Sequence, residues 1–214
     1  MKNLEEFIND DSIIDADSLI KLAIIHHQFE SIHPFYDGNG RTGRIINILY
    51  LVIKDLLDLP ILYLSRYIIS NKSEYYKLLQ EVRDQDAWEP WILFILKGIE
   101  ITAQETIGLV QKIGYLMQTY KVGIKKKLPN IYRHELLNNL FSHPYTKIEF
   151  VQQELNVNRQ TASKYLQKLA EQDFIQSVKI GRNKYYLNLP LIKLFIDAGK
   201  QIGLSQDSIE SVNQ

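Results

Sequence analysis

The chain has 214 residues, with 25 Lys and Arg against 25 Asp and Glu, 45% hydrophobic residues and no cysteine. This length suits one or two domains, and the absence of cysteine excludes disulfide-stapled folds and thiolate chemistry. No apolar run approaches the length of a membrane span and the N-terminus lacks an apolar leader, so we expect a cytoplasmic protein without a membrane partner.

The two halves of the chain carry opposite charge. Residues 1–124 hold 12 Lys and Arg against 17 Asp and Glu, whereas residues 125–214 hold 13 against 8. Such asymmetry indicates two parts with different partners. Because a lysine run and a proline lie at this change, we expect a first domain over 1–124 and a linker over 125–130. A second domain then covers 131–190, and a helix with a polar tail covers 191–214.

The start of the chain is rich in acidic residues and has no long apolar period, so we expect it to be loosely ordered. Apolar residues then recur at helical spacing, with Asp17 or Ser18 as the N-cap of a helix. Within this helix His26 and His27 point in different directions, and only Glu30 is placed as a co-ligand for a metal. Two ligands do not make a metal site, so we expect packing roles for both histidines.

The most informative stretch runs from His33 to Arg44 and reads HPFYDGNGRTGR. Pro34 ends the preceding helix, and the Gly-Asn-Gly run permits the positive φ angles that turn successive backbone N–H groups inward. An apolar helix over 45–53 follows, so its free N–H donors and its dipole face the same concavity. Arg41 and Arg44 lie on one face of its first turn, where cations oppose the dipole unless an anion lies between them. The stretch therefore predicts a polyphosphate cradle.

Two further residues of this stretch add chemistry to the cradle. The Asp37 carboxylate would be repelled by phosphates unless a divalent cation bridges them, and Mg²⁺ with one carboxylate is the usual arrangement. His33 is then the nearby group able to act as a base near neutral pH. An ordinary polar loop joining two core helices is the alternative, which accounts for a lone glycine-rich turn but not for all these residues together.

This stretch resembles the signature of the Fic family, His-x-Phe-x-(Asp/Glu)-Gly-Asn-Gly-Arg-x-x-Arg, at every specified position. The resemblance extends through residues 59–65, 74–79 and 88–91, and so covers roughly the first 120 residues. It implies a mainly α protein, with a Fic-type helical bundle and a small N-terminal β-hairpin flap. A target protein is then expected to dock on the flap as an added strand.

The resemblance also implies a reaction, the transfer of AMP from ATP to a Tyr, Thr or Ser hydroxyl of a target protein with release of pyrophosphate. His33 would take the hydroxyl proton, and Asp37 would hold Mg²⁺ against the phosphates. Phe35 is expected to anchor the loop in the core. Tyr75 and Tyr76 either edge the adenine pocket or fill the edge of the core. The expected phosphate-binding residues are Gly38, Asn39, Gly40, Arg41, Thr42, Gly43 and Arg44.

Two other function classes stay open. One is a different Fic-type nucleotide or phosphoryl transfer; the intact Gly-Asn-Gly run argues against kinase-like variants, whereas another nucleotide donor such as UTP remains an alternative. The other is a nucleotide-sensing, DNA-binding regulator without catalysis.

The sequence after residue 88 begins with a long helix that has Pro90 in its first turn and reaches about Tyr120. Beyond the lysine run, three short helices lie between residues 132 and 169, with Asn158 as the N-cap of the third. Two strands over 174–180 and 184–188 follow, so the order predicts a winged helix-turn-helix.

The outward face of the third short helix and the tip of the hairpin are polar and basic. Such a face suits a DNA major groove, and a basic wing suits phosphates. The alternative is a protein-docking or dimerisation surface. The residues expected to make either contact are Arg159, Gln160, Ser163, Lys164 and Arg182.

Proteins that resemble this chain are restrained by a helix bearing (Ser/Thr)-x-x-x-Glu-(Gly/Asn), whose glutamate pairs with the second motif arginine, here Arg44. The nearest match is 70–74, but Tyr75 follows where Gly or Asn is required. Since only 32 residues precede His33, we expect either a truncated form or an inhibitory partner that supplies the glutamate in trans.

Overall fold

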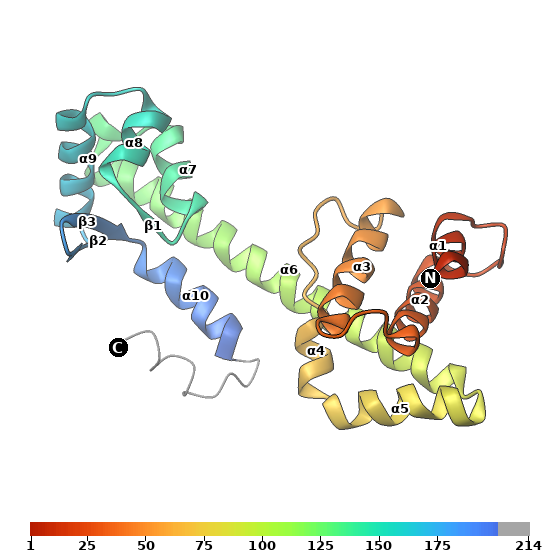
Figure 1. Cartoon of the computed structure of the whole chain (residues 1–214). Helices are drawn as coiled ribbons and strands as arrows, with labels where there is room; N and C mark the ends of the chain where they lie inside the picture. Colours follow the sequence, from red (N-terminus) through yellow and green to blue (C-terminus); the bar gives the residue numbers. More distant parts are fainter. Residues whose placement is uncertain (201–214) are drawn as a thin grey trace. The chain divides into compact units, whose positions relative to one another are not determined.

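The computed structural model of the chain describes residues 1–200, and most of them are helical (Figure 1). The chain divides into two compact units, Met1–Ile107 and Gly108–Gln214. Within the described residues, no helix combines the length and the apolar character that crossing a bilayer requires. The predicted polar tail lies outside the described residues beyond Lys200. The helices of the first unit are α1 (Lys2–Asn9), α2 (Ser18–Ile32), α3 (Asn39–Ile53), α4 (Ser65–Ser70), α5 (Lys72–Gln85) and the first part of α6 (Trp88–Lys127).

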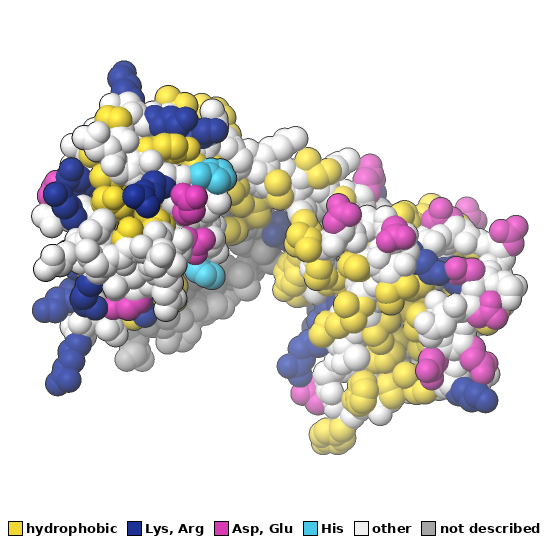
Figure 2. Space-filling view, turned by 90° about the horizontal axis from the view of Figure 1, so that it is seen from above, with side chains coloured by type: hydrophobic (Ala, Val, Ile, Leu, Met, Phe, Trp, Pro, Cys, Tyr) yellow, Lys and Arg dark blue, Asp and Glu magenta, His cyan; other side chains and the backbone are white. Residues whose placement is uncertain are grey.

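The surfaces of the two units differ in charge, as the charge difference between the two halves of the sequence predicts. Figure 2 shows Asp and Glu side chains gathered over the first unit, whereas Lys and Arg side chains predominate over the second. The two units therefore offer different electrostatic surfaces to partners.

The expected N-terminal β-hairpin flap is wrong for this chain, because the segment forms helix α1 instead. Its apolar residues Leu4, Phe7 and Ile8 follow helical spacing and pack in the core, where Leu4 is buried. The side chains of Lys21 and Lys54 donate hydrogen bonds to the Asp11 carboxylate and so hold the turn that follows α1. The same hydrogen bonds lower the pKa of Asp11 to about 2. No strand is present between residues 1 and 142, so this part of the structure offers no strand edge to a target.

Helix α2 begins and ends as the sequence predicts. The Asp17 side chain accepts a hydrogen bond from the Leu19 N–H at 2.7 Å and so caps its N-terminus. His33, directly before Pro34, takes the left-handed conformation with φ 49° and forms the C-cap. The loop that follows therefore begins at a well-defined helix end.

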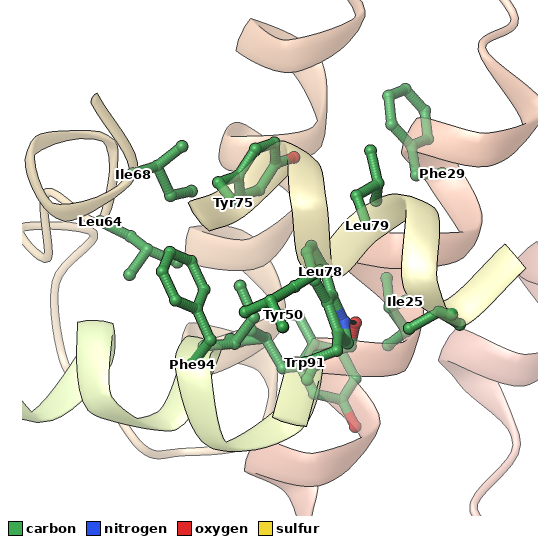
Figure 3. Close-up of a cluster of buried hydrophobic side chains, with 14 of the residues drawn as sticks. Ile25, Phe29, Tyr50, Leu64, Ile68, Tyr75, Leu78, Leu79, Trp91 and Phe94 are labelled. Carbon is green, nitrogen blue, oxygen red and sulfur yellow. Dashed lines mark hydrogen bonds between the residues drawn. The ribbon is translucent and has the colours of Figure 1, made fainter. Parts of the chain in front are cut away.

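The core of the first unit is built around Trp91 of α6 (Figure 3). This side chain is fully buried, and its Nε1–H donates a hydrogen bond to the backbone oxygen of Ala23 in α2 at 2.9 Å. Its ring stacks on His26 with centroids 5.9 Å apart and lies 5.5 Å from Tyr75 and 6.5 Å from Phe94. The packing therefore joins α2, α5 and α6, and α2 leads directly into the motif loop.

Both α2 histidines have packing roles, as predicted. His26 Nε2 lies 3.0 Å from the Tyr75 hydroxyl, and His27 Nε2 lies 3.2 Å from the backbone oxygen of Leu79. Burial lowers the pKa of both rings, that of His26 to about 3. His26 is therefore neutral in the folded protein at physiological pH.

We expect the first unit to lose stability as the pH falls below about 6.5. Because the pKa of His26 is about 3 in the folded chain and near 6.5 when exposed, the unfolded chain binds more protons between these values. Stability from a neutral His26 is therefore complete above pH 6.5, and about 2 kcal/mol of it is lost between pH 7 and pH 5. Urea unfolding at both pH values, followed by tryptophan fluorescence, measures the loss.

Variants at two histidines isolate this effect. His26→Gln keeps a hydrogen-bond partner for Tyr75 but cannot titrate, so its unfolding free energy should depend less on pH. His143→Gln removes an exposed histidine of the second unit and should leave the dependence unchanged. Equal slopes in the wild type and the His26→Gln variant would contradict this assignment. The raised pKa of Glu30 acts in the opposite direction and is common to all three proteins.

The boundary between the units differs from the predicted linker. Helix α6 continues to Lys127, so residues 125–127 form its last turn. Tyr120 and Ile124 of the same helix are buried in the core of the second unit. The apolar residues of this region therefore extend the helix through the lysine run, and a cut at 125–129 would remove part of the second core.

The second unit contains the remaining elements in the order predicted for a winged helix-turn-helix. A three-stranded antiparallel sheet has the order β1-β3-β2, with Val178 opposite Tyr185 in the hairpin. Asn158 caps α9 through a hydrogen bond from the Thr161 N–H at 2.8 Å, and Gly181 turns the hairpin with φ 58°. The elements are η1 (Pro129–Ile131), α7 (His134–Ser142), β1 (Tyr145–Thr146), α8 (Ile148–Leu155), α9 (Arg159–Glu171), β2 (Gln176–Ile180), β3 (Asn183–Leu187) and α10 (Leu189–Lys200).

Candidate active site

The loop between α2 and α3 is closed by one buried side chain, Asn39. Its Oδ1 accepts a hydrogen bond from the Phe35 N–H at 2.8 Å, and its Nδ2 donates to the Phe35 backbone oxygen. The Phe35 ring itself is 49% exposed, so the expectation that it anchors the loop in the core is wrong. The anchor is the Asn39 amide, and the backbone N–H of Asn39 remains for a ligand.

Helix α3 starts without a capping side chain. Gly38 is its N-cap and has φ 88°, which only glycine adopts readily. The Thr42 hydroxyl donates to the Gly38 oxygen at 3.1 Å, within the first turn. The backbone donors of the first turn therefore stay available, and together with the helix dipole they favour an anion at this end.

Asp37 and Arg41 pair with each other at the mouth of the loop. Asp37 Oδ2 lies 3.0 Å from Arg41 Nη2, and Asp37 Oδ1 accepts the Gly38 N–H at 2.7 Å. Both side chains are more than 70% exposed, so the ion pair contributes at most about 1 kcal/mol. Each partner can therefore exchange the other for a ligand at little cost.

The same residues fit a bridging Mg²⁺ ion. One exposed carboxylate, next to an anion site that would supply phosphate oxygens, is a ligand set that Mg²⁺ accepts. Within residues 1–200, no group of three or more His, Cys, Asp or Glu side chains is arranged to hold a metal by itself. The ion would therefore arrive with a phosphate ligand rather than reside in a protein cage.

The predicted residues from His33 to Arg44 lie together on the loop and the first two turns of α3. His33 is exposed, Arg44 is partly buried, and Gly43 is buried against the side chains of α2. Glu30, one turn before His33 on α2, also lies against this turn, because a Cβ at Gly43 would be 2.8 Å from Glu30 Oε1. The motif spacing does not reveal Glu30, since the contact depends on how α2 packs on α3.

The two tyrosines of α5 occupy different environments. Tyr75 is 5% exposed and packs in the core, and burial raises the pKa of its hydroxyl. Tyr76 is 55% exposed, and its ring lies edge-on to Tyr75 with centroids 5.2 Å apart. Tyr75 therefore fills the core edge, which leaves only Tyr76 available at the surface for a base.

The five residues expected to contact DNA or a protein belong to the second unit. Arg159 and Gln160 are exposed at the start of α9, Lys164 is exposed one turn later, and Ser163 beside it is partly exposed. Arg159 Nη1 lies 3.3 Å from Glu149 Oε1. Arg182 is exposed at the tip of the β2–β3 hairpin. They form a polar, mostly basic surface of this unit.

Comparison with known proteins finds two matching family models. The model of the Fic/DOC family matches residues 1–51, which include the whole His33–Arg44 stretch. A second model, described as the C-terminal domain of SoFic-like protein adenylyltransferase, matches residues 116–191. The two matches fall in different units of the chain.

Individual relatives match over about half of this chain. Protein adenylyltransferase fic-1 of Caenorhabditis elegans is 29% identical over 111 residues, which are 52% of this chain and 20% of that protein. Protein adenylyltransferase Fic of Drosophila erecta is 28% identical over 123 residues, or 56% of this chain and 23% of that protein. The matched segments thus span about a fifth of the length of these relatives.

A solved structure is also similar. The crystal structure of a Fic family protein from Desulfovibrio desulfuricans G20 aligns with 86% of this chain and 53% of its own, with 21% identity and a TM-score of 0.46. A Fic/DOC model matches the motif segment and a SoFic-like model matches most of the second unit, so the two matches together support a Fic family protein.

Proposed function

We propose that this protein is a Mg²⁺-dependent protein adenylyltransferase that moves AMP from ATP to a Tyr, Thr or Ser hydroxyl of a target protein. The observation that carries the proposal is the uncapped N-terminus of α3, entered through Gly38 and flanked by His33, Arg41 and Arg44. Relatives named protein adenylyltransferase support the reaction type.

Each motif residue has a role in this reaction. His33 takes the proton of the incoming hydroxyl, whose oxygen bonds to the α-phosphorus while the bond to pyrophosphate breaks. The free N–H groups of Asn39 and Gly40 and the two arginines bind phosphate oxygens, and arginine suits this task through its forked, charge-assisted hydrogen bonds. Asp37 would hold Mg²⁺, which would neutralise phosphate charge. Most of the acceleration then comes from positioning and charge neutralisation, as in other phosphoryl-type transfers.

ATP labelled at either the α or the γ phosphate tests the reaction type. Incubation of the chain with Mg²⁺ and each label, alone and with candidate proteins, should transfer the α label only. Transfer of the γ label would identify a kinase instead, and an α label from UTP would identify another nucleotide donor. Tight ATP binding without any transfer would favour a nucleotide-sensing regulator.

Regulation in trans is a further part of the proposal. A partner that presents a glutamate to Arg44 would compete with the outer phosphates for the guanidinium. Within the described residues, Arg44 has no carboxylate within ion-pair distance of 4.0 Å, so such a partner would meet a guanidinium that none of residues 1–200 holds in an ion pair.

A nucleic-acid contact of the second unit is a second candidate function, favoured by the exposed Arg159, Lys164 and Arg182. We expect affinity for duplex DNA to fall about tenfold or more between 50 and 200 mM salt if two or more phosphates are contacted. Fluorescence anisotropy with labelled DNA at several salt concentrations measures the slope. Lys164→Ala should reduce the slope by about one, whereas salt-independent or absent binding would favour a protein-docking surface.

A further inference from the structure

One oxygen of the Glu30 carboxylate, Oε1, is buried without a hydrogen-bond partner among the described residues. Its Oε1 is enclosed beneath the first turn of α3, and no donor within the described residues reaches it. A buried carboxylate oxygen without a partner costs free energy, so native structures seldom retain one without a role. This group therefore calls for an explanation other than stability.

Two glycines of α3 lie beside the Glu30 and Arg44 side chains, and Gly43 makes room for Glu30. A Cβ at Gly43 would lie 2.8 Å from Glu30 Oε1, closer than real Cβ contacts come, and a tight 3.1 Å from Phe29. A Cβ at Gly40 would lie 3.7 Å from Glu30 Oε1 and 3.1 Å from Arg44 Nη1. The Glu30 carboxylate and the Arg44 guanidinium therefore lie against the same side of the same helical turn.

The position of Glu30 is fixed from outside the loop. Arg83 of α5 donates through Nη2 to the Glu30 backbone oxygen at 3.3 Å and through Nε to the Ser31 hydroxyl at 3.2 Å. These bonds join the last turn of α2 to α5. Glu30 thus projects from the end of α2, which Arg83 of α5 holds in place. A fixed backbone is what a residue needs in order to orient a neighbouring side chain.

Basic groups surround the carboxylate on several sides. Burial raises the pKa of Glu30, while the positive charge of Arg44 first, and then that of His33 and Arg83, opposes this rise. The neutral His26 and Tyr75 lie on the core side of the same cluster. Arg44 is therefore the strongest electrostatic partner of Glu30, although the two are not within ion-pair distance.

We propose that Glu30 is a positioning residue of the phosphate site, whose carboxylate holds the Arg44 guanidinium over Gly40 at the N-terminus of α3. Without an anion, a guanidinium at this end is repelled by the helix dipole. A carboxylate fixed behind the turn offsets this repulsion, and its separation from Arg44 leaves the guanidinium hydrogen bonds free for phosphate. The role rests on the proposed binding of ATP at this site.

A double-mutant cycle on nucleotide binding tests the proposal. The probe is an ATP analogue with a methylene group between the α and β phosphorus atoms, which prevents transfer. It is titrated into the protein in the presence of Mg²⁺, and calorimetry measures its affinity. Glu30→Gln, which removes the charge but keeps the shape, should weaken binding about tenfold in the wild-type chain. In the Arg44→Ala background the same change should alter affinity less than twofold, because the residue through which Glu30 acts is absent.

Three outcomes would overturn the proposal: unchanged binding by the Glu30→Gln variant, tighter binding by it, or the same loss of affinity in both arginine backgrounds. Unchanged binding would mean that the carboxylate has no part in nucleotide binding, tighter binding would mean that it only repels phosphate, and equal losses would mean a merely structural role. Glu30→Asp, which keeps the charge on a shorter side chain, should fall between the wild type and Glu30→Gln, and a Glu30→Asp variant as weak as Glu30→Gln would count against the proposal.

Controls separate this result from folding and from the reaction itself. Glu89→Gln removes an exposed glutamate of the same unit and should leave binding unchanged. Thermal melting should show Glu30→Gln at least as stable as the wild type, because the variant removes an unpaired buried charge. If the analogue binds with the expected coupling but no α label is transferred from ATP, the proposed reaction fails while the role of Glu30 stands.

Discussion

Replacement of His33 by alanine is expected to lower AMP transfer by about 10²–10⁴-fold, the usual effect of removing a general base. His33 is the exposed imidazole that the end of α2 delivers to the mouth of the phosphate loop. It acts on the acceptor hydroxyl rather than on the nucleotide, so affinity for the methylene analogue of ATP should stay within about twofold. The transfer of α-labelled phosphate and calorimetry measure the two quantities separately.

Two controls distinguish loss of the base from damage to the loop. His33 has φ 49°, a conformation that asparagine adopts more readily than alanine. His33→Asn should therefore preserve the loop and still be inactive, whereas His143→Ala removes an exposed histidine of the second unit and should retain full transfer. Undiminished labelling by His33→Asn would show that another group takes the proton.

Replacement of Trp91 by alanine is expected to destabilise the first unit by about 3–5 kcal/mol. The change leaves a cavity where a fully buried indole packs on His26, and it leaves the buried Ala23 carbonyl without its donor. Urea unfolding followed by the fluorescence of Trp88, the remaining tryptophan, reports on this unit. The midpoint should move to much lower urea concentration.

Two further variants, one at Trp91 itself and one at Leu93, calibrate this loss. Trp91→Phe keeps an aromatic ring but not the hydrogen bond, so it should cost clearly less than Trp91→Ala. Leu93, which is 57% exposed on the same helix, should tolerate alanine within about 0.5 kcal/mol. If Trp91→Ala and Leu93→Ala unfold at the same urea concentration, the assigned role of the indole is wrong.

The sequence predicts most of the features that depend on neighbouring residues. Asp17 and Asn158 cap their helices as expected, because capping requires only the side chain and the N–H groups two or three residues later. Gly38 turns the loop for an equally local reason. The hairpin strands of the second unit lie within two residues of their predicted bounds.

The features that the sequence does not predict depend on contacts between distant residues. The N-terminal segment is helical because Leu4 finds a place in the core of the first unit, which no local pattern reveals. Likewise α6 does not end near Tyr120 before a linker, because Tyr120 is buried in the core of the second unit and the helix continues past it. Glu30 belongs to the site only because α2 and α3 pack at two glycines. Such placements require the tertiary structure.

The loop also contains a site prone to deamidation, which the folded structure protects. An asparagine before glycine is the pair most prone to deamidation, in which the backbone nitrogen of the glycine attacks the side-chain amide to form a cyclic imide. Asn39 precedes Gly40, but its amide is bonded at both ends to Phe35 and is held at the start of a helix. The folded chain should therefore deamidate slowly at this position. A chain that is deamidated while unfolded would refold with a carboxylate at residue 39. That carboxylate could not donate a hydrogen bond to Phe35, and it would place negative charge where phosphate binds.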